Sequence, residues 1–162
     1  MRPPPAISFL VTATALSGLL AGGNFVRMFI EMPAWRRTGS MSWAAFSKRA
    51  DLGTGLVLYP MLAIGGALFT IAAWVMVRRE PSVKRAALPL GVATILVAAG
   101  LALTSFAAPQ MLSLPALGND AGAVQRAFEA FNFWGNLRGV VQILAFAADL
   151  WAFARLLGPA PS

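Results

Sequence analysis

Apolar residues fill four long stretches of the 162-residue chain. They cover residues 7–30, 52–77, 88–106 and 133–157. Each stretch approaches or exceeds the roughly 20 residues that an α-helix needs to cross about 30 Å of hydrocarbon. The pattern therefore predicts an all-α fold, an integral membrane four-helix bundle that forms a single four-span domain over residues 1–162.

The loop after the first span carries an amphipathic segment. Ser42 is the expected N-cap of a short helix that has Trp43 on one side and Lys48 and Arg49 beyond it. Tryptophan prefers the depth of the lipid headgroups, so one interpretation is a short interfacial helix on the membrane surface. The other interpretation is a lid packed over the mouth of the bundle, and the sequence leaves both open.

Glycine and proline positions indicate where the spans pack, bend and end. Gly18 and Gly22 form a small-xxx-small motif, which lets another membrane helix approach closely. Pro33 is expected to end the first helix, and Pro60 is expected to bend the second. Pro89 fits the first turn of the third helix.

The link between the third and fourth spans, residues 107–130, has a different character. Pro109 and several glycine and asparagine residues make it rich in loop formers. Asn119 or Asp120 is the expected cap of a helix that begins near Ala121 and runs into the fourth span. A link of this length with many apolar residues is more typical of a functional loop than of disorder.

The charge distribution indicates that the lipid bilayer is the partner of this chain. Charged residues make up 12% of the chain, about half the usual share, and the net charge is +7. Basic pairs flank the spans at Arg36-Arg37, Lys48-Arg49, Arg78-Arg79 and Lys84-Arg85. Anionic headgroups account for this placement better than nucleic acid, which is not expected to bind. The basic turn at 78–85 predicts a multi-pass protein of the bacterial inner membrane with both termini in the cytoplasm.

Cysteine and histidine are absent from the chain. Haem, zinc and iron sites usually depend on these residues, so we expect no metal and no cofactor. The six carboxylates are scattered, without the Glu-x-x-His pairs of di-iron bundles. Glu31 follows Arg27 by four residues, and the two are expected to form an ion pair near the end of the first span.

The fourth span carries polar side chains at positions where hydrocarbon is expected. Trp134, Arg138 and Gln142 share one helical face, and Asn136 lies on a second polar edge. An arginine left in hydrocarbon costs several kcal/mol, so Arg138 must find a partner within the protein. The candidate ligand-binding residues are Trp134, Asn136, Arg138, Gln142 and Asn24, and no catalytic residue is assigned.

The partner of Arg138 has several candidates: Glu129, Asn24 and the backbone carbonyls of residues 109–115. Two interpretations of Arg138 remain open. It reaches out to the headgroups and locks the bundle, or it faces a cavity that binds an enolate, phenolate or quinone oxygen. Asp149 lies within about three turns of the chain's end and is expected at the interface.

With these residues the chain resembles the anthrone oxygenase-like family of four-helix membrane proteins. The likeness covers nearly the whole chain, through the small-residue run 19–23, the segment 32–35, the basic loop 46–49, the Pro109 link and the motif Trp134-Gly-Asn-Leu-Arg138. In that family the last motif reads Trp-Asn-His-x-Arg. Trp134 and Arg138 match it, whereas Gly135 replaces the asparagine and Asn136 the histidine. Asn136 can form hydrogen bonds but cannot accept a proton near neutral pH.

The resemblance implies a cofactor-free oxygenase that acts on a small aromatic or quinone-like molecule. Arg138 would stabilise the anion of that molecule, and Asn136 and Trp134 would position its ring. The missing histidine favours an alternative function as a non-catalytic accessory or structural subunit, bound to other membrane subunits or to copies of itself. A transporter or channel is a third possibility, but no ring of carboxylates or filter motif supports it.

Overall fold

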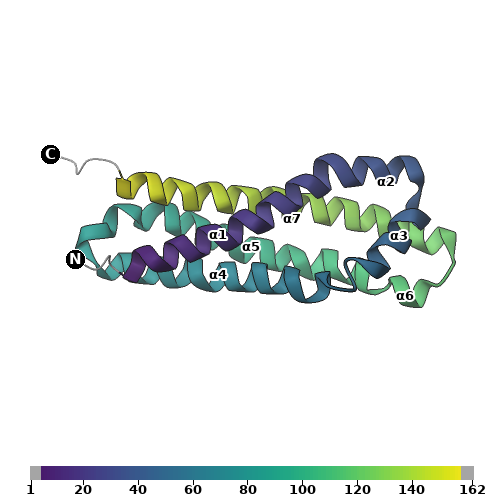
Figure 1. Ribbon diagram of the computed structural model, residues 1–162, viewed down its shortest axis with the longest axis horizontal. Helices are drawn as coiled ribbons and strands as arrows, with labels where there is room; N and C mark the ends of the chain where they lie inside the picture. Colours follow the sequence, from purple (N-terminus) through teal and green to yellow (C-terminus); the bar gives the residue numbers. More distant parts are fainter. Residues whose placement is uncertain (1–4, 158–162) are drawn as a thin grey trace.

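The computed structural model describes residues 5–157 and contains no strand in that range. The ends of the predicted domain, residues 1–4 and 158–162, lie outside the described residues. Four helical rods are long and apolar enough to cross a membrane, and they run side by side in Figure 1: Pro5–Thr38, Gly55–Arg79, Pro81–Leu117 and Ala121–Leu156. The predicted all-α membrane bundle of four helices is confirmed.

Residues 5–157 form nine helical elements, eight of which make up the four rods. The first comprises α1 (Pro5–Val26), the π-helical segment η1 (Arg27–Glu31) and α2 (Met32–Thr38), and α3 (Ser40–Arg49) follows it. The other three rods comprise α4 (Gly55–Arg79), η2 (Pro81–Ala86) with α5 (Ala87–Leu112) and α6 (Leu114–Leu117), and α7 (Ala121–Leu157). α1 packs mainly on α4 and α7, and α5 packs on the same two helices, so the ring order is α1, α4, α5, α7.

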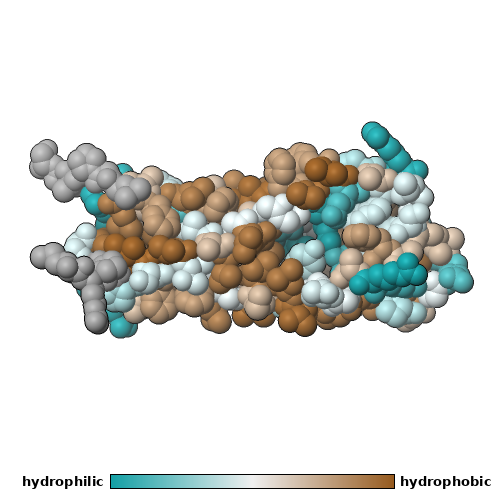
Figure 2. All heavy atoms as spheres, in the orientation of Figure 1, coloured by the Kyte–Doolittle hydropathy of each residue, from teal (hydrophilic) through white to brown (hydrophobic). Residues whose placement is uncertain are grey.

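The apolar belt places the bundle in the bilayer. Apolar side chains cover the middle of the face shown in Figure 2, and hydrophilic ones lie toward the ends. α7 has 37 residues and spans about 55 Å, well beyond about 30 Å of hydrocarbon. Counting about 20 residues from Arg79, Ala87 and Arg155 at the η2 end places the other hydrocarbon boundary near Tyr59, Ala107 and Gly135.

Two clusters of buried apolar side chains hold opposite ends of the bundle. The turn cluster lies at the η2 end and contains Ala6, Leu10, Ala73, Val77, Val83, Ala86, Leu90 and Ala152. The lid cluster lies at the other end, where α2, α3 and α6 form a lid over α5 and α7 (Figure 1). It contains Met32, Trp35, Trp43, Ala44, Ala107, Met111, Leu114, Val124, Ala127, Phe128 and Phe131.

Trp43 decides between the two interpretations of the first loop. Its side chain is 0% exposed and packs on the rings of Phe128 and Phe131, with centroid distances of 5.3 and 5.5 Å. A tryptophan buried between protein rings is part of a core rather than an anchor among headgroups. The short helix is therefore a lid. It begins at Ser40, directly after Gly39, so the expected cap at Ser42 is wrong.

The first helix does not end at Pro33. The N–H of Met32 bonds to the carbonyl of Arg27, five residues earlier, which is the pattern of a π-helix. Pro33 then falls in the first turn of α2, where its missing N–H is tolerated. The helix ends instead at Gly39, whose φ of 95° is accessible to glycine at little cost.

The predicted loop at 107–130 is mostly helical. α5 continues through Pro109 to Leu112, because Ala107 and Met111 are buried in the lid cluster and their packing outweighs one lost backbone bond. The expected N-cap is confirmed at Asp120, whose Oδ1 accepts the N–H of Ala123 at 2.9 Å. Pro89 lies in the first turn of α5, as predicted, and α4 continues unbroken through Pro60.

A ladder of polar side chains joins α1 to α7. Ser17 Oγ donates to Asp149 Oδ2 at 2.8 Å, and Asn24 Nδ2 donates to Gln142 Oε1 at 2.6 Å. The two contacts are seven residues apart on each helix, so one antiparallel register aligns both. Asp149 is 0% exposed, and its predicted interfacial position is wrong because Ser17 faces it inside the bundle. Gly18 lies under the ring of Phe146, and a Cβ there would be 3.0 Å from Cε2.

Replacing Ser17 with alanine is expected to lower the free energy of unfolding by about 1–3 kcal/mol, because it removes the hydrogen bond to a buried carboxylate. Unfolding by sodium dodecyl sulfate in mixed micelles measures the loss. The matched control is Ser105→Ala, whose exposed hydroxyl bonds only within its own helix, to the carbonyl of Ala102. Equal unfolding free energies for the two variants would show that the ladder does not stabilise the bundle.

Candidate functional site

A cavity of about 370 Å³ lies between the turn cluster and the lid cluster. Its volume falls in the range of small-molecule sites, roughly 300–1,000 Å³. Its wall is mainly apolar and comes from α1, η1, the turn before α4, α4, α5 and α7. The polar residues that line it are Asn24, Arg27, Asp51, Tyr59, Thr104, Arg138 and Gln142.

Arg27 is held at the outer end of the cavity by three side chains. Its guanidinium forms a buried ion pair and hydrogen bond with Asp51, and its Nε lies 3.5 Å from Glu31 Oε2. Its Nη2 also donates to the hydroxyl of Tyr59 at 3.4 Å. The guanidinium lies 5.4 Å from the ring centroid of Tyr59 and 5.7 Å from that of Phe131. The predicted pair of Arg27 with Glu31 is confirmed, and the charge of Arg27 is compensated locally.

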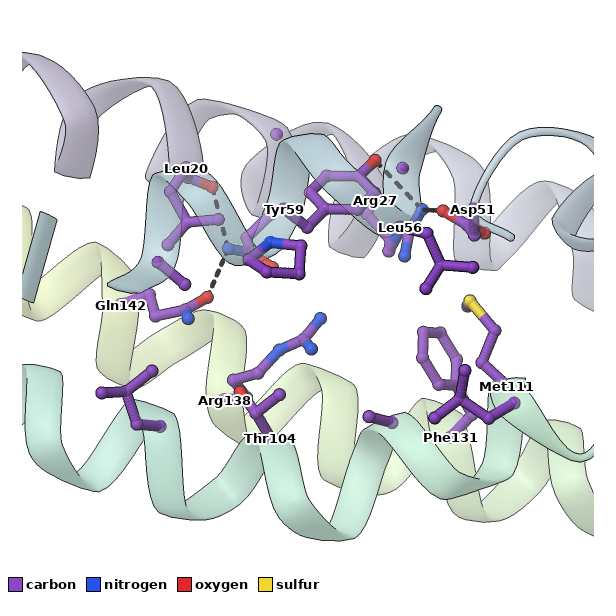
Figure 3. Close-up of a pocket in the computed structure, with 18 of the residues that line it drawn as sticks. Leu20, Arg27, Asp51, Leu56, Tyr59, Thr104, Met111, Phe131, Arg138 and Gln142 are labelled. Atoms are coloured by element: carbon purple, nitrogen blue, oxygen red, sulfur yellow. Dashed lines mark hydrogen bonds and ion pairs between the residues drawn. The ribbon is translucent and has the colours of Figure 1, made fainter. Parts of the chain in front are cut away.

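Arg138 has no such compensation. In Figure 3 its side chain extends from α7 into the cavity, above Thr104 and facing Tyr59 and Arg27. Its Nε is buried, and among residues 5–157 no hydrogen bond or ion pair reaches its guanidinium. By the count above, Arg138 lies about one helical turn inside the hydrocarbon boundary. The site therefore holds an unpaired cation beside an apolar space.

The expected partners of Arg138 bind elsewhere. Glu129 Oε1 accepts a bond from Gln125 at 2.8 Å on the exposed outer part of α7. Asn24 is engaged by Gln142 and by the carbonyl of Leu20 at 2.8 Å. No carbonyl of residues 109–115 accepts a bond from Arg138. These three assignments are wrong, because no hydrogen bond or ion pair joins Arg138 to Glu129, to Asn24 or to these carbonyls in the described part of the chain.

The amides of Asn24 and Gln142 form one wall of the cavity. Gly100 on α5 makes room for Gln142, since a Cβ at position 100 would lie 3.2 Å from Gln142 Cγ. The hydrogen bond from Asn24 to Gln142 Oε1 fixes the orientation of both amides relative to the cavity. The amide nitrogen of Gln142, which this bond does not use, therefore has a fixed direction.

The five candidate ligand-binding residues divide into two groups. Asn24, Arg138 and Gln142 line the cavity. Trp134 stacks on Phe106, with centroids 4.9 Å apart, and Asn136 Nδ2 donates to Asn132 Oδ1 at 3.1 Å. Neither Trp134 nor Asn136 lines the cavity. Trp134 shares a helical face with Arg138, but its ring packs on Phe106, whereas Asn136 lies on a different face of α7.

Sequence reasoning missed Asp51, Tyr59 and Thr104. One signal was available: Tyr59 is the only tyrosine in the chain. Within the described residues, no three carboxylates gather where they would hold a metal ion.

The fold and the cavity define a class, a multi-pass helical membrane protein with a charged cavity at the edge of the hydrocarbon. No family model, curated protein or solved structure matches this chain. The resemblance to anthrone oxygenases stays a prediction.

Proposed function

We propose that this membrane protein binds a small planar aromatic or quinone-like molecule in the cavity, with a ligand oxygen against the guanidinium of Arg138. The observation that carries the proposal is the unpaired state of Arg138 beside an apolar space. A buried cation without a partner is costly, and an anionic or strongly polarised oxygen would offset that cost.

Charge balance favours a ligand that carries an anionic oxygen. Asp51 and Glu31 both lie against Arg27, and neither is within ion-pair distance of Arg138. A phenolate or enolate oxygen would supply the missing partner through a charge-assisted hydrogen bond. The apolar remainder of the cavity suits the ring system, with the aromatic side chains of Tyr59 and Phe131 in its wall.

The proposal concerns binding, and turnover would need a proton acceptor beside the ligand. Asn136, at the position of the family histidine, bonds to Asn132 and does not line the cavity. Asp51 is the one carboxylate among the described lining residues, and Arg27 already engages it. Oxygenase activity is therefore an extension of the proposal, which dioxygen consumption with an anthrone as substrate would test.

Replacing Arg138 with glutamine is expected to weaken binding of an anionic hydroxyquinone by about 10- to 100-fold, the equivalent of about 1.4–2.8 kcal/mol. The probe is 2-hydroxy-1,4-naphthoquinone, which is anionic at neutral pH. Its affinity for the chain in lipid nanodiscs is measured by equilibrium dialysis against empty nanodiscs.

Two controls separate the cavity from general attraction to a basic protein. Arg126→Gln removes an exposed charge from the same helix and is expected to leave the affinity unchanged. The neutral 1,4-naphthoquinone is expected to lose less affinity than the anion in the Arg138 variant. Equal affinities of wild type and Arg138→Gln for the anionic probe would refute the proposed site.

A further inference from the structure

The cavity is open between α4 and α5. Several residues of its wall are also exposed on the outer surface of the bundle: Leu56 (48% exposed), Pro60, Ile64 (51%), Leu101 (37%) and Leu112 (55%). A residue that lines a cavity and also lies on the surface marks the rim of an opening. We call these five residues the portal.

The buried clusters join α4 to α5 only near the turn that connects these two helices. At the η2 end both helices contribute to the turn cluster, through Ala73 and Val77 on α4 and Leu90 on α5. At the opposite end the buried lid cluster contains α5 residues such as Ala107 and Met111, but none from α4. The first turns of α4 contact Arg27 through Tyr59 instead, which leaves the space beside α5 open.

The inner part of the portal, Ile64 and Leu101, faces lipid, whereas Leu56 and Leu112 lie outside the hydrocarbon boundary and Pro60 lies at it. Ile64 lies five residues inward of Tyr59, about 7–8 Å toward the centre of the bilayer from the hydrocarbon boundary. Leu101 lies six residues inward of Ala107. Arg138 and Gln142 on α7 and Asn24 on α1 occupy the opposite wall, while Tyr59 on α4 and Thr104 on α5 are polar groups on the portal side. An occupant would therefore meet charge at one end and acyl chains at the other.

We propose that the ligand is a membrane amphiphile, with an oxygen-bearing ring at Arg138 and an apolar tail that leaves between α4 and α5 into the bilayer. The inference rests on the proposed function and adds the class of ligand, a lipid-soluble hydroxyquinone or related enol that carries an alkyl or isoprenoid chain. A portal at this depth requires no closed pocket for the tail, because lipid solvates the part outside the protein.

The test uses 2-hydroxy-1,4-naphthoquinones with a methyl or a dodecyl group at carbon 3. Affinities are measured in nanodiscs, with ligand concentration expressed per lipid so that partitioning cancels. Wild type is expected to bind both analogues within threefold of each other. Ile64→Trp, which adds bulk at the rim, is expected to weaken the dodecyl analogue at least tenfold and the methyl analogue less than threefold. Leu68→Trp is the matched control, since Leu68 is exposed one turn further along α4 and does not line the cavity.

The outcomes separate this inference from the proposed function. Wild type that binds the methyl analogue but rejects the dodecyl analogue overturns the portal and leaves the binding site. Equal effects of Ile64→Trp on both analogues, including no effect, also overturn the portal. Failure of wild type to bind either analogue overturns the proposed function itself. Ile64→Phe serves as a smaller obstruction if the tryptophan variant does not fold.

Discussion

Alanine in place of Trp43 is expected to lower the free energy of unfolding by about 3–5 kcal/mol, the usual cost of emptying a fully buried aromatic site. Trp43 is 0% exposed and contacts Phe128 and Phe131, so its removal leaves a void between α3 and α7. Phe131 also lines the cavity. Because the variant removes the ring that packs on Phe131, it is also expected to weaken hydroxyquinone binding. Both effects are measured on the same preparation, by titration with sodium dodecyl sulfate and by equilibrium dialysis.

Trp151→Ala is the matched control for the lid. Trp151 lies on α7 and is 43% exposed among other apolar surface residues. Acyl chains of the lipid can therefore fill most of the space that the indole ring leaves. Its replacement is expected to cost less than about 1 kcal/mol and to leave ligand affinity unchanged. Equal losses of stability in the two variants would contradict the assignment of α3 as a packed lid.

Asparagine in place of Asp51 is expected to cost about 3–5 kcal/mol of unfolding free energy, because it leaves Arg27 without its buried partner. The side chains of Arg27 and Asp51 are 12% and 2% exposed, so water compensates little for the loss. The reciprocal variant Arg27→Gln leaves the buried carboxylate of Asp51 without its cationic partner. In the double variant neither group carries a charge, and its loss of stability is expected to be smaller than the sum of the single losses.

Arg36→Gln provides the control for this cycle. Arg36 is exposed on α2, and its replacement is expected to change stability by less than about 0.5 kcal/mol. Strict additivity of the stability losses in the Arg27 and Asp51 variants would mean that the two side chains are not coupled. Asp51 would then not be the residue that holds Arg27 at the outer end of the cavity.

The sequence was sufficient for the class of the protein. The length of an apolar stretch is a local property, and the thickness of the bilayer converts it directly into a span. The cap at Asp120 and the pair of Arg27 with Glu31 were also readable, because both join residues at most four positions apart. The polar face of the fourth span correctly drew attention to Arg138 and Gln142 as inward-facing groups.

The sequence predicts helix ends near proline less accurately than it predicts the spans. The sequence predicts a helix end at Pro33 and a loop around Pro109, whereas the chain is helical through both. A π-helical turn accommodates the first, and packing in the lid cluster compensates the second. The packing that compensates Pro109 is not visible in a local window of sequence, because the lid cluster brings Ala107 and Met111 together with residues of α2, α3 and α7.

The sequence by itself determined four spans, their helical nature and the arginine within the fourth. Only the tertiary structure decided what surrounds that arginine. The antiparallel register of α1 on α7 pairs Asn24 with Gln142 and Ser17 with Asp149, so these groups bond to one another and not to Arg138. The convergence of Asp51 and Tyr59 on Arg27 likewise depends on where the lid brings the chain back to α4. Register between helices is set by side-chain packing over the whole bundle, so no single stretch of sequence contains it.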